Sequence, residues 1–190
     1  MRKIVAGLFQ TLDGVVESPQ EWQLAYFNDE MGREIGAQRA AADTMLLGRR
    51  TYQEFAAYWP HQPSQTPFAD YMNTTPKLVV STTLDTIEWQ NSTLISGDVV
   101  AELTKLTQQP GKNLNITGSV SLVRSLLREG LLDELRVMIC PIVLGSGRRL
   151  VEDGGGQVPL RLGHATTFST GVLSLTSTPV DKLTSTPADE

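Results

Sequence analysis

The stretch that decides the fold reads Thr44-Met45-Leu46-Leu47-Gly48-Arg49-Arg50-Thr51-Tyr52. It opens with a mostly apolar run of the kind found in buried strands, and a glycine ends that run. Glycine lets the backbone approach a ligand closely, and the first turn of a following helix offers unpaired N–H groups. Arg49 and Arg50 supply forked donors that can hold phosphate oxygens. The stretch therefore predicts a strand-to-helix junction that binds a phosphorylated cofactor, although Gly-Arg pairs also end strands that bind nothing.

Strands and helices alternate on both sides of this junction. We expect strands at 2–10, 44–47, 77–82, 93–96, 114–117 and 134–143, and helices at 21–42, 51–57, 68–73, 98–108 and 120–129. Two short runs, 165–168 and 172–176, flank Ser169-Thr170-Gly171 and predict an antiparallel hairpin. The alternation favours a doubly wound α/β fold with a mostly parallel central sheet, and the hairpin then lies at the C-terminal edge of that sheet.

Composition and charge are those of one globular domain. The chain has 190 residues, of which 40% are hydrophobic and 19% charged, and its formal net charge is −5. This balance gives a nucleic-acid partner no electrostatic support. The N-terminal apolar run is too short for a signal peptide or a membrane span, so no membrane partner and a cytoplasmic location are expected. The lone cysteine, Cys140, excludes an internal disulfide and a cysteine-based zinc site, and no metal is expected.

The domain is expected to cover residues 1–176. Residues 177–190 contain Ser-Thr-Pro twice, a composition that predicts a disordered polar tail.

Three strand ends of the expected sheet carry groups suited to phosphate. They are Gly48–Thr51, Ser81-Thr82-Thr83 and Thr117–Val120. Open α/β sheets bind ligands at the carboxyl ends of their strands, so the three would lie along one edge. The hydroxyls could equally cap turns, and Gly118-Ser119 could be an ordinary strand-to-helix junction. Neither a dinucleotide fingerprint nor a P-loop occurs in the sequence, so a nucleotide would bind by another geometry.

Six segments carry a resemblance to a known family. They are Leu12-Asp13-Gly14, Gly48-Arg49-Arg50-Thr51, Val79-Val80-Ser81-Thr82, Ile116-Thr117-Gly118-Ser119, Gly130-Leu131-Leu132-Asp133-Glu134-Leu135 and Pro141-Ile142-Val143-Leu144-Gly145-Ser146-Gly147. With these segments the chain resembles the dihydrofolate reductase-like superfamily over residues 2–176. Within that superfamily it is most similar to the reductase domain of the bifunctional riboflavin-biosynthesis deaminase-reductases. The deaminase half needs His-x-Glu and Pro-Cys-x-x-Cys, which are absent.

The resemblance implies that the strand ends bind NADPH. The residues that it assigns to the cofactor are Val16, Gly48, Arg49, Arg50, Thr51, Ser81, Thr82, Gly118, Ser119 and Val120. Two arginines beside hydroxyl donors suit the 2′-phosphate of NADPH, and no acidic residue for the free ribose hydroxyl of NAD is evident. The resemblance also implies a homodimer.

The substrate site is expected between the Asp13–Val16 loop and the helix that follows. Trp22 and Tyr26 are the candidate substrate contacts, and core packing at helical spacing is their alternative. Asp13 and Glu21 are the candidate catalytic acids, and an Asp-Gly turn is the alternative for Asp13. The position of the acid that binds the pterin ring in dihydrofolate reductases corresponds here to Gln23. A shift of the helix by two residues would place Glu21 at that position instead.

The sequence therefore predicts an NADPH-dependent oxidoreductase of the riboflavin-biosynthesis reductase type. It would transfer a hydride to a small heterocyclic or sugar-linked pyrimidine, such as 5-amino-6-(5-phosphoribosylamino)uracil. Two alternatives stay open, which are a non-catalytic nucleotide-binding protein that retains the cofactor cleft and a dihydrofolate reductase.

Overall fold

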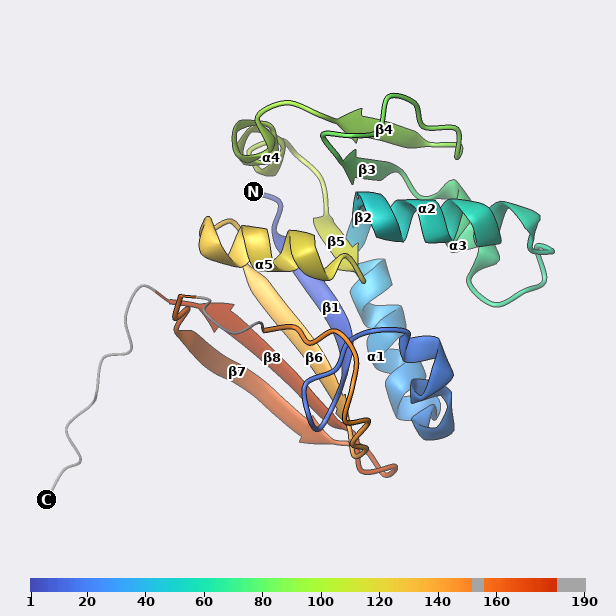
Figure 1. The fold of residues 1–190 in the computed structure, drawn as a ribbon, viewed down its shortest axis with the longest axis vertical. Coiled ribbons are helices and arrows are strands. Elements are labelled where there is room, and N and C mark those ends of the chain that lie inside the picture. Colours follow the sequence, from blue (N-terminus) through green and yellow to red (C-terminus); the bar gives the residue numbers. More distant parts are fainter. Residues whose placement is uncertain (152–155, 181–190) are drawn as a thin grey trace, which may run out of the picture.

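A computed structural model describes residues 1–151 and 156–180. Its centre is one eight-stranded sheet in the order β4-β3-β2-β5-β1-β6-β8-β7 (Figure 1). The pairings among β1 to β6 are parallel, and β8 pairs antiparallel with both β6 and β7. The predicted fold class, a mostly parallel sheet with a C-terminal antiparallel hairpin, is confirmed.

The elements have the following bounds. The strands are β1 Ile4–Thr11, β2 Ala42–Gly48, β3 Lys77–Val80, β4 Ser92–Ile95, β5 Asn113–Thr117, β6 Glu134–Cys140, β7 Leu160–Thr167 and β8 Leu173–Pro179. The α-helices are α1 Asp29–Ala40, α2 Arg49–Tyr58, α3 Ala69–Thr74, α4 Val99–Thr107 and α5 Val120–Arg128. Three short 3-10 helices are η1 Pro19–Glu21, η2 Gln23–Tyr26 and η3 Trp59–His61.

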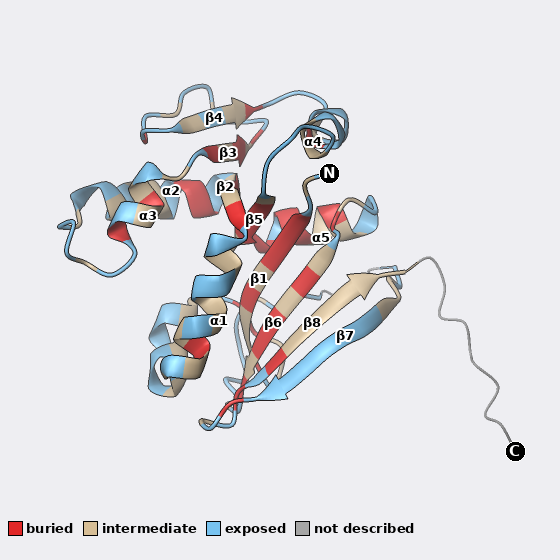
Figure 2. Ribbon diagram, turned by 180° about the vertical axis from the view of Figure 1, so that it is seen from behind, coloured by how far each residue is buried: buried red, intermediate tan, exposed pale blue. Residues whose placement is uncertain are grey.

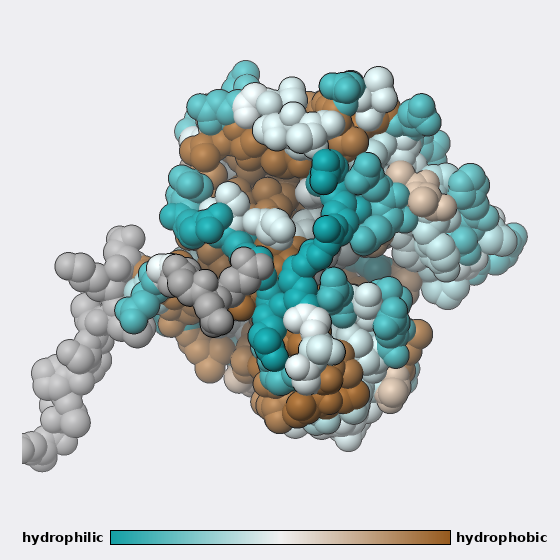
Figure 3. Space-filling model, viewed as in Figure 1, coloured by the Kyte–Doolittle hydropathy of each residue, from teal (hydrophilic) through white to brown (hydrophobic). Residues whose placement is uncertain are grey.

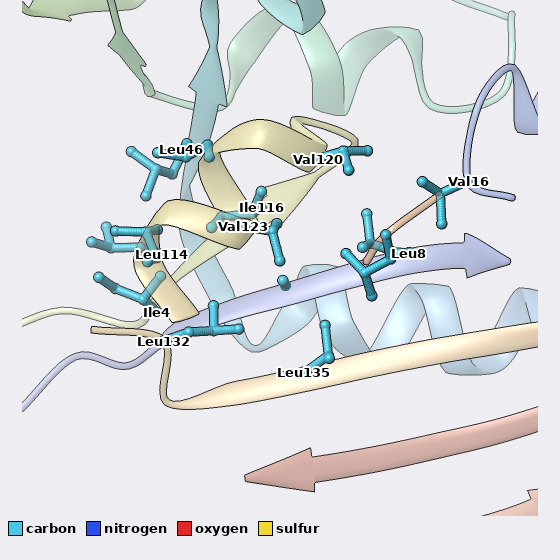
Figure 4. Close-up of a cluster of buried hydrophobic side chains, with 14 of the residues drawn as sticks. Ile4, Leu8, Val16, Leu46, Leu114, Ile116, Val120, Val123, Leu132 and Leu135 are labelled. Carbon is cyan, nitrogen blue, oxygen red and sulfur yellow. The ribbon is translucent and has the colours of Figure 1, made fainter. Parts of the chain in front are cut away.

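Helices cover the parallel part of the sheet on both faces. Ile4 and Leu8 of β1 belong to the largest core cluster, together with Val123 of α5 (Figure 4). Phe9 of the same strand packs instead in a cluster with Met31 of α1. Successive residues of a strand point to opposite faces, so α1 and α5 lie on opposite sides of β1. This is the doubly wound arrangement that the alternating pattern predicts.

The single helix expected at 21–42 is wrong. The chain instead forms η1 and η2, and α1 begins only at Asp29. Asn28 caps α1, because its side-chain oxygen accepts a hydrogen bond from the N–H of Met31 at 3.0 Å. A 3-10 turn places residues i and i+3 on one side, so its apolar spacing imitates that of an α-helix. Trp22 and Tyr26 therefore lie on these turns and not on the helix.

The C-terminal strands are longer than expected. β7 begins at Leu160 and β8 reaches Pro179, past the expected domain boundary at 176. Residues 181–190 of the expected tail lie outside the described residues. β6 ends at Cys140, three residues before the expected end of this strand.

The β7–β8 hairpin has one polar and one apolar side. The polar side holds Arg161, His164, Thr166, Ser174, Thr176 and Thr178, and the more apolar side holds Leu160, Leu162, Ala165, Leu173 and Leu175 together with Thr167, Ser177 and Pro179. Leu162 is 56% exposed and Leu173 is 40% exposed. Figure 2 shows the contrast between this open hairpin and the buried strands at the centre of the sheet. Within residues 1–151 and 156–180, no helix is both long and apolar enough to cross a membrane.

Candidate active site

The site lies where the topology of the sheet switches. β5 runs between β2 and β1, and α5 follows β5 on one face while α1 follows β1 on the other. Adjacent parallel strands whose connections leave on opposite faces open a crevice beyond their carboxyl ends. Gly48, Thr117 and Thr11 end β2, β5 and β1 respectively, so all three border this crevice.

The ends of β2 and β5 are joined by side-chain hydrogen bonds. The N–H of Gly48 donates to Oγ of Ser119 at 2.9 Å, and the N–H of Ser119 donates to Oγ1 of Thr51 at 2.9 Å. Gly118 and Ser119 both have left-handed backbones, with φ of +68° and +52°. A Cβ on Gly118 would lie 3.2 Å from Cγ2 of Thr51, so α2 and the start of α5 approach as closely as glycine permits. Two of the three predicted strand ends thus form one unit.

The end of β3 contacts the same unit through an arginine. Nη1 of Arg49 donates to Oγ1 of Thr83 at 2.8 Å. Oγ of Ser81 accepts the N–H groups of Thr83 and Leu84 at 3.2 and 3.1 Å, and Ser81 is buried, so its oxygen closes the turn after β3. The hydroxyl beside Arg49 therefore belongs to Thr83. Thr83 is absent from the predicted set of site residues, although the Ser81-Thr82-Thr83 run contains it.

The remaining predicted cofactor residues lie around the same crevice. Arg50 and Thr82 are exposed. Val16 and Val120 are buried in the core cluster, where the loop after β1 approaches α5 (Figure 4). A groove also runs between β3, β4 and α4, lined by Leu78, Thr93, Leu94, Ile95, Ser96, Gly97, Asp98, Ala101, Glu102 and Leu106. In Figure 3 apolar side chains surround a hollow between α4 and α5.

The carboxylate of Asp13 is surrounded by hydrogen-bond donors. Oγ1 of Thr11 donates to it at 2.6 Å, and the N–H groups of Gly145 and Leu144 donate at 2.9 and 3.3 Å. The Thr11 hydroxyl, with these amides, lowers the pKa of Asp13 to about 2. At neutral pH this group is ionised and carries no proton to donate. Nε of Arg149 further donates to the backbone carbonyl of Asp13 at 2.9 Å.

Segment 143–150 covers the loop that contains Asp13. Val15 pairs antiparallel with Arg149, and Oε2 of Glu17 accepts the N–H of Arg148 at 3.1 Å. Nε of Arg124 in α5 donates to the carbonyl of Leu150 at 2.7 Å, which ties the segment to α5. The pairing of this segment with the loop after β1 was not predicted. The motif at 141–147 supports the family resemblance, but it does not indicate what the segment contacts.

The predicted substrate residues have separate environments. Trp22 is 7% exposed in the core cluster with Met31, and its Nε1 donates to the carbonyl of Glu17 at 3.0 Å. Tyr26 is partly buried, and its hydroxyl lies 3.5 Å from the carbonyl of Pro141. Glu21 is exposed on η1.

Gln23 occupies the place where the pterin acid was expected. It begins η2, and its Oε1 is buried with no hydrogen-bond partner among the described residues. A buried acceptor without a donor is unfavourable unless a ligand or water supplies one.

Comparisons with known proteins agree with this fold. The sequence model of the RibD C-terminal domain matches residues 2–174. The uncharacterized protein YyaP of Bacillus subtilis (strain 168) is 30% identical over 178 residues, which cover 92% of this chain and 93% of that protein. A protein from Shewanella sp. PV-4, named as a candidate riboflavin biosynthesis protein, superposes with a TM-score of 0.76 and 19% identity over 94% of this chain and 99% of its own. Dihydrofolate reductase from Enterococcus faecalis, complexed with NADP(H) and RAB-propyl, superposes with a TM-score of 0.58 and 13% identity over 94% and 97% of the two chains. At such low identities the two structures establish the shared fold alone.

Proposed function

The chain belongs to the RibD C-terminal domain family, and from this premise we propose that it is a cytoplasmic NADPH-dependent reductase. The observation that carries the proposal is the convergence of three strand ends at the topological switch. There, Gly48 and Thr51 are hydrogen-bonded to Ser119, and Arg49 is hydrogen-bonded to Thr83. The Enterococcus dihydrofolate reductase has the same fold and is complexed with NADP(H), which supports a nucleotide at this edge.

The phosphate groups of the cofactor would contact two places in the crevice. Arg49 and Arg50, with the hydroxyls of Thr82 and Thr83, suit the 2′-phosphate, because guanidinium groups bind phosphate oxygens through paired donors. The first turn of α5, a helix of 9 residues, offers its N–H groups to the pyrophosphate. The groove between β3, β4 and α4 would receive the adenosine.

The bound cofactor would supply the hydride, and the protein orients it and excludes water. Val16 and Val120 would form the apolar floor beside the nicotinamide. Asp13 would keep the loop after β1 in place through its hydrogen bonds to Leu144 and Gly145. We therefore assign Asp13 a positioning role, because a group with a pKa of about 2 does not supply a proton at neutral pH.

The substrate would lie against η2. Oε1 of Gln23, which is buried and has no hydrogen-bond partner among the described residues, would accept a hydrogen bond from a ring N–H, and the Tyr26 hydroxyl lies 3.5 Å from the carbonyl of Pro141. A neutral amide suits a neutral pyrimidine better than a protonated pterin, so a sugar-linked pyrimidine is favoured over dihydrofolate. Glu21, exposed on η1, is the remaining candidate for proton supply, and Trp22 supports the turn from the core.

The homodimer is proposed through the apolar side of the β7–β8 hairpin. Leu162 and Leu173 stand exposed there, and burying such a surface on a second copy stabilises association. Light scattering should give the mass of two chains, and the double variant Leu162→Glu/Leu173→Glu should give the mass of one. A wild-type mass of one chain would contradict this part of the proposal.

The cofactor is tested by titrating the protein with NADPH and with NADH while its tryptophan fluorescence is monitored. NADPH should bind more tightly, and Arg49→Ala should weaken NADPH roughly 10- to 100-fold while changing NADH little, from the loss of a charged hydrogen bond. Arg161→Ala on the hairpin is the matched control and should bind as the wild type does. Failure of the wild type to bind either nucleotide at millimolar concentration would refute the proposal.

A second candidate is a nucleotide-binding protein without turnover. The state of Asp13 favours it, because a carboxyl with a pKa of about 2 is ionised at neutral pH and has no proton to donate. Oxidation of NADPH should be followed against a panel of pyrimidines, pterins and quinones. Tight binding with no oxidation by any of them would favour this second candidate.

A further inference from the structure

We propose that Asn115 and Gln38 are specificity-determining residues that hydrogen-bond the hydroxyl groups of the sugar in a sugar-linked substrate. The inference rests on the proposed function, and it concerns the face of the sheet beneath α1 rather than the phosphate groups of the cofactor. Three observations carry it, which are a buried amide without a partner, a second amide that lies against a glycine, and a neighbouring arginine whose charge is already compensated.

The apolar packing on this face of the sheet is interrupted at β5. One cluster of buried residues contains Met31 of α1, and a second contains Met45 of β2 and Tyr52 of α2. Asn115 pairs in register with Val5 on one side and with Met45 on the other, yet it belongs to neither cluster. Strands favour β-branched and aromatic residues and are poor in asparagine. Packing therefore does not account for an asparagine at this position.

The amide of Asn115 is buried without a partner. The residue is 6% exposed, and its side chain forms no hydrogen bond with any residue in the described part of the chain. A buried amide that lacks a partner is unfavourable, and native proteins keep few of them. Thr117, two residues further along β5, lies on the same face, is partly exposed and borders the crevice. A substrate that enters beside Thr117 therefore meets an amide that is free to pair with it.

Gly7 brings a second amide to the same place. It lies on β1 opposite Thr117 and is partly exposed, although β1 is a central strand. A Cβ on Gly7 would lie 2.5 Å from Oε1 of Gln38, so the end of the Gln38 side chain occupies the space that a side chain on β1 would fill. The amide of Gln38 also forms no hydrogen bond with a described residue. Adjacent strands lie about 4.7–4.9 Å apart, so one sugar can contact both amides.

The charge next to these amides is already compensated. Arg136 pairs in register with Gly7 on the other side of β1, and its guanidinium forms ion pairs with Glu134 and, at 3.7 Å, with Glu34. An anionic group would be held best by a cation that is free of such partners. Amides and hydroxyls both donate and accept hydrogen bonds without carrying charge, so they fit each other. The ligand group that suits this place is therefore an uncharged group with several hydroxyls.

The first experiment measures stability without ligand. Asn115→Val removes the amide and keeps much of the side-chain volume, and Asn113→Val is the matched control. Asn113 lies two residues earlier on the same strand and face, and it is partly exposed with no side-chain hydrogen bond to a described residue. We expect the urea midpoint to rise at least as much in Asn115→Val as in Asn113→Val, because an unpaired amide costs more where it is buried. A smaller rise, or a fall, means that the amide is already satisfied in the free protein and overturns the inference.

The second experiment compares the binding of uridine with that of 2′,3′-dideoxyuridine, which lacks two sugar hydroxyls. Titrations are monitored by the NMR signals of the protein. The wild type and Asn113→Val should bind uridine roughly tenfold more tightly than the dideoxy compound, because the hydroxyls add hydrogen bonds. Asn115→Val and Gln38→Met should bind the two nucleosides about equally. Gly7→Ala should do so as well, because its Cβ displaces the amide of Gln38.

The outcomes separate this inference from the proposed function. If the wild type binds both nucleosides equally, or binds neither, the sugar site is refuted, and the NADPH titration still decides the cofactor. A preference for uridine that persists in Asn115→Val also overturns the inference. If the wild type prefers uridine but does not bind NADPH, the proposed function fails while the sugar site stands.

Discussion

Replacing Gly118 with alanine tests how closely the end of β5 approaches α2. The backbone of Gly118 is left-handed, with φ of +68°, and an added Cβ would lie 3.2 Å from Cγ2 and 3.3 Å from Oγ1 of Thr51. Two separate costs follow, one from the backbone and one from packing. The chain offers one glycine that carries the backbone cost alone and one that carries neither cost.

Gly130 carries the backbone cost alone. Its φ is +66°, and nothing lies within 4 Å of an added Cβ, so Gly130→Ala should lose about 1–2 kcal/mol. Gly36 in α1 carries neither cost, because a Cβ there also meets nothing within 4 Å and its φ is ordinary. Gly36→Ala should therefore gain about 0.4–1 kcal/mol from the reduced entropy of the unfolded chain.

Gly118→Ala adds an overpacked contact to the backbone cost. Forcing extra volume into a packed site costs about 1–3 kcal/mol, so the total loss should be about 2–5 kcal/mol. Urea unfolding followed by circular dichroism measures all three variants. The double variant Gly118→Ala/Thr51→Ser should recover part of the loss, because serine lacks Cγ2.

A loss for Gly118→Ala no larger than that for Gly130→Ala would refute the close approach to Thr51. Losses that simply add in the double variant would refute it as well, since residues in contact are expected to couple.

Three further predictions concern pH and reactivity. The Thr11 hydroxyl and the Gly145 and Leu144 amides lower the pKa of Asp13 to about 2, so the stability contributed by its carboxylate is present above its ordinary value of 3.8 and is lost as pH falls toward 2. In Asp13→Asn the urea midpoint of unfolding should therefore fall less than in the wild type as the pH is lowered toward 2. An equal fall in both proteins would contradict the hydrogen bonds of the Asp13 carboxylate. Burial lowers the pKa of Lys77 from 10.5 to about 8, so the unfolded chain binds a proton that the folded state has released and stability rises between these pH values. Lys77→Met should abolish this rise in stability. If the rise persists in the variant, another group causes it. Burial raises the pKa of the Cys140 thiol to about 11, so a disulfide reagent should label it at pH 8 only after unfolding, and rapid labelling of the native protein would contradict its burial.

The general architecture could be predicted because it follows from local patterns. The apolar runs that end in glycine and enter helices are visible in the sequence, and parallel pairing brings their carboxyl ends to one edge. This reasoning expects Gly48 and Gly118-Ser119 along one edge of the sheet, and the structure further shows that the two strand ends are in direct contact there. It does not predict the direction of the Ser119 side chain, because a serine gives no local sign that its backbone will be left-handed.

The features that were missed depend on contacts between distant segments. The sequence suggests either a catalytic acid or a turn residue at Asp13, and its donors at Leu144 and Gly145 come from the far half of the chain. The turns at 19–26 read as helix because their apolar spacing is the same, and only the Asn28 cap separates them from α1. Contacts between segments far apart in the sequence decide both the environment of Asp13 and the conformation of residues 19–26, and a short stretch of sequence does not contain them.

The position of β1 has a consequence for how this chain is made. β1 leaves the ribosome before the other strands of this sheet, and it lies between β5 and β6, where Ile4 pairs with Leu114 and Val5 pairs with Glu134. During synthesis β1 must wait, unpaired and largely apolar, until more than half of the protein has followed it. Such long-range parallel pairing is slow, and it exposes the chain to aggregation. The central part of the sheet is therefore expected to form only after β5 and β6 have been synthesised.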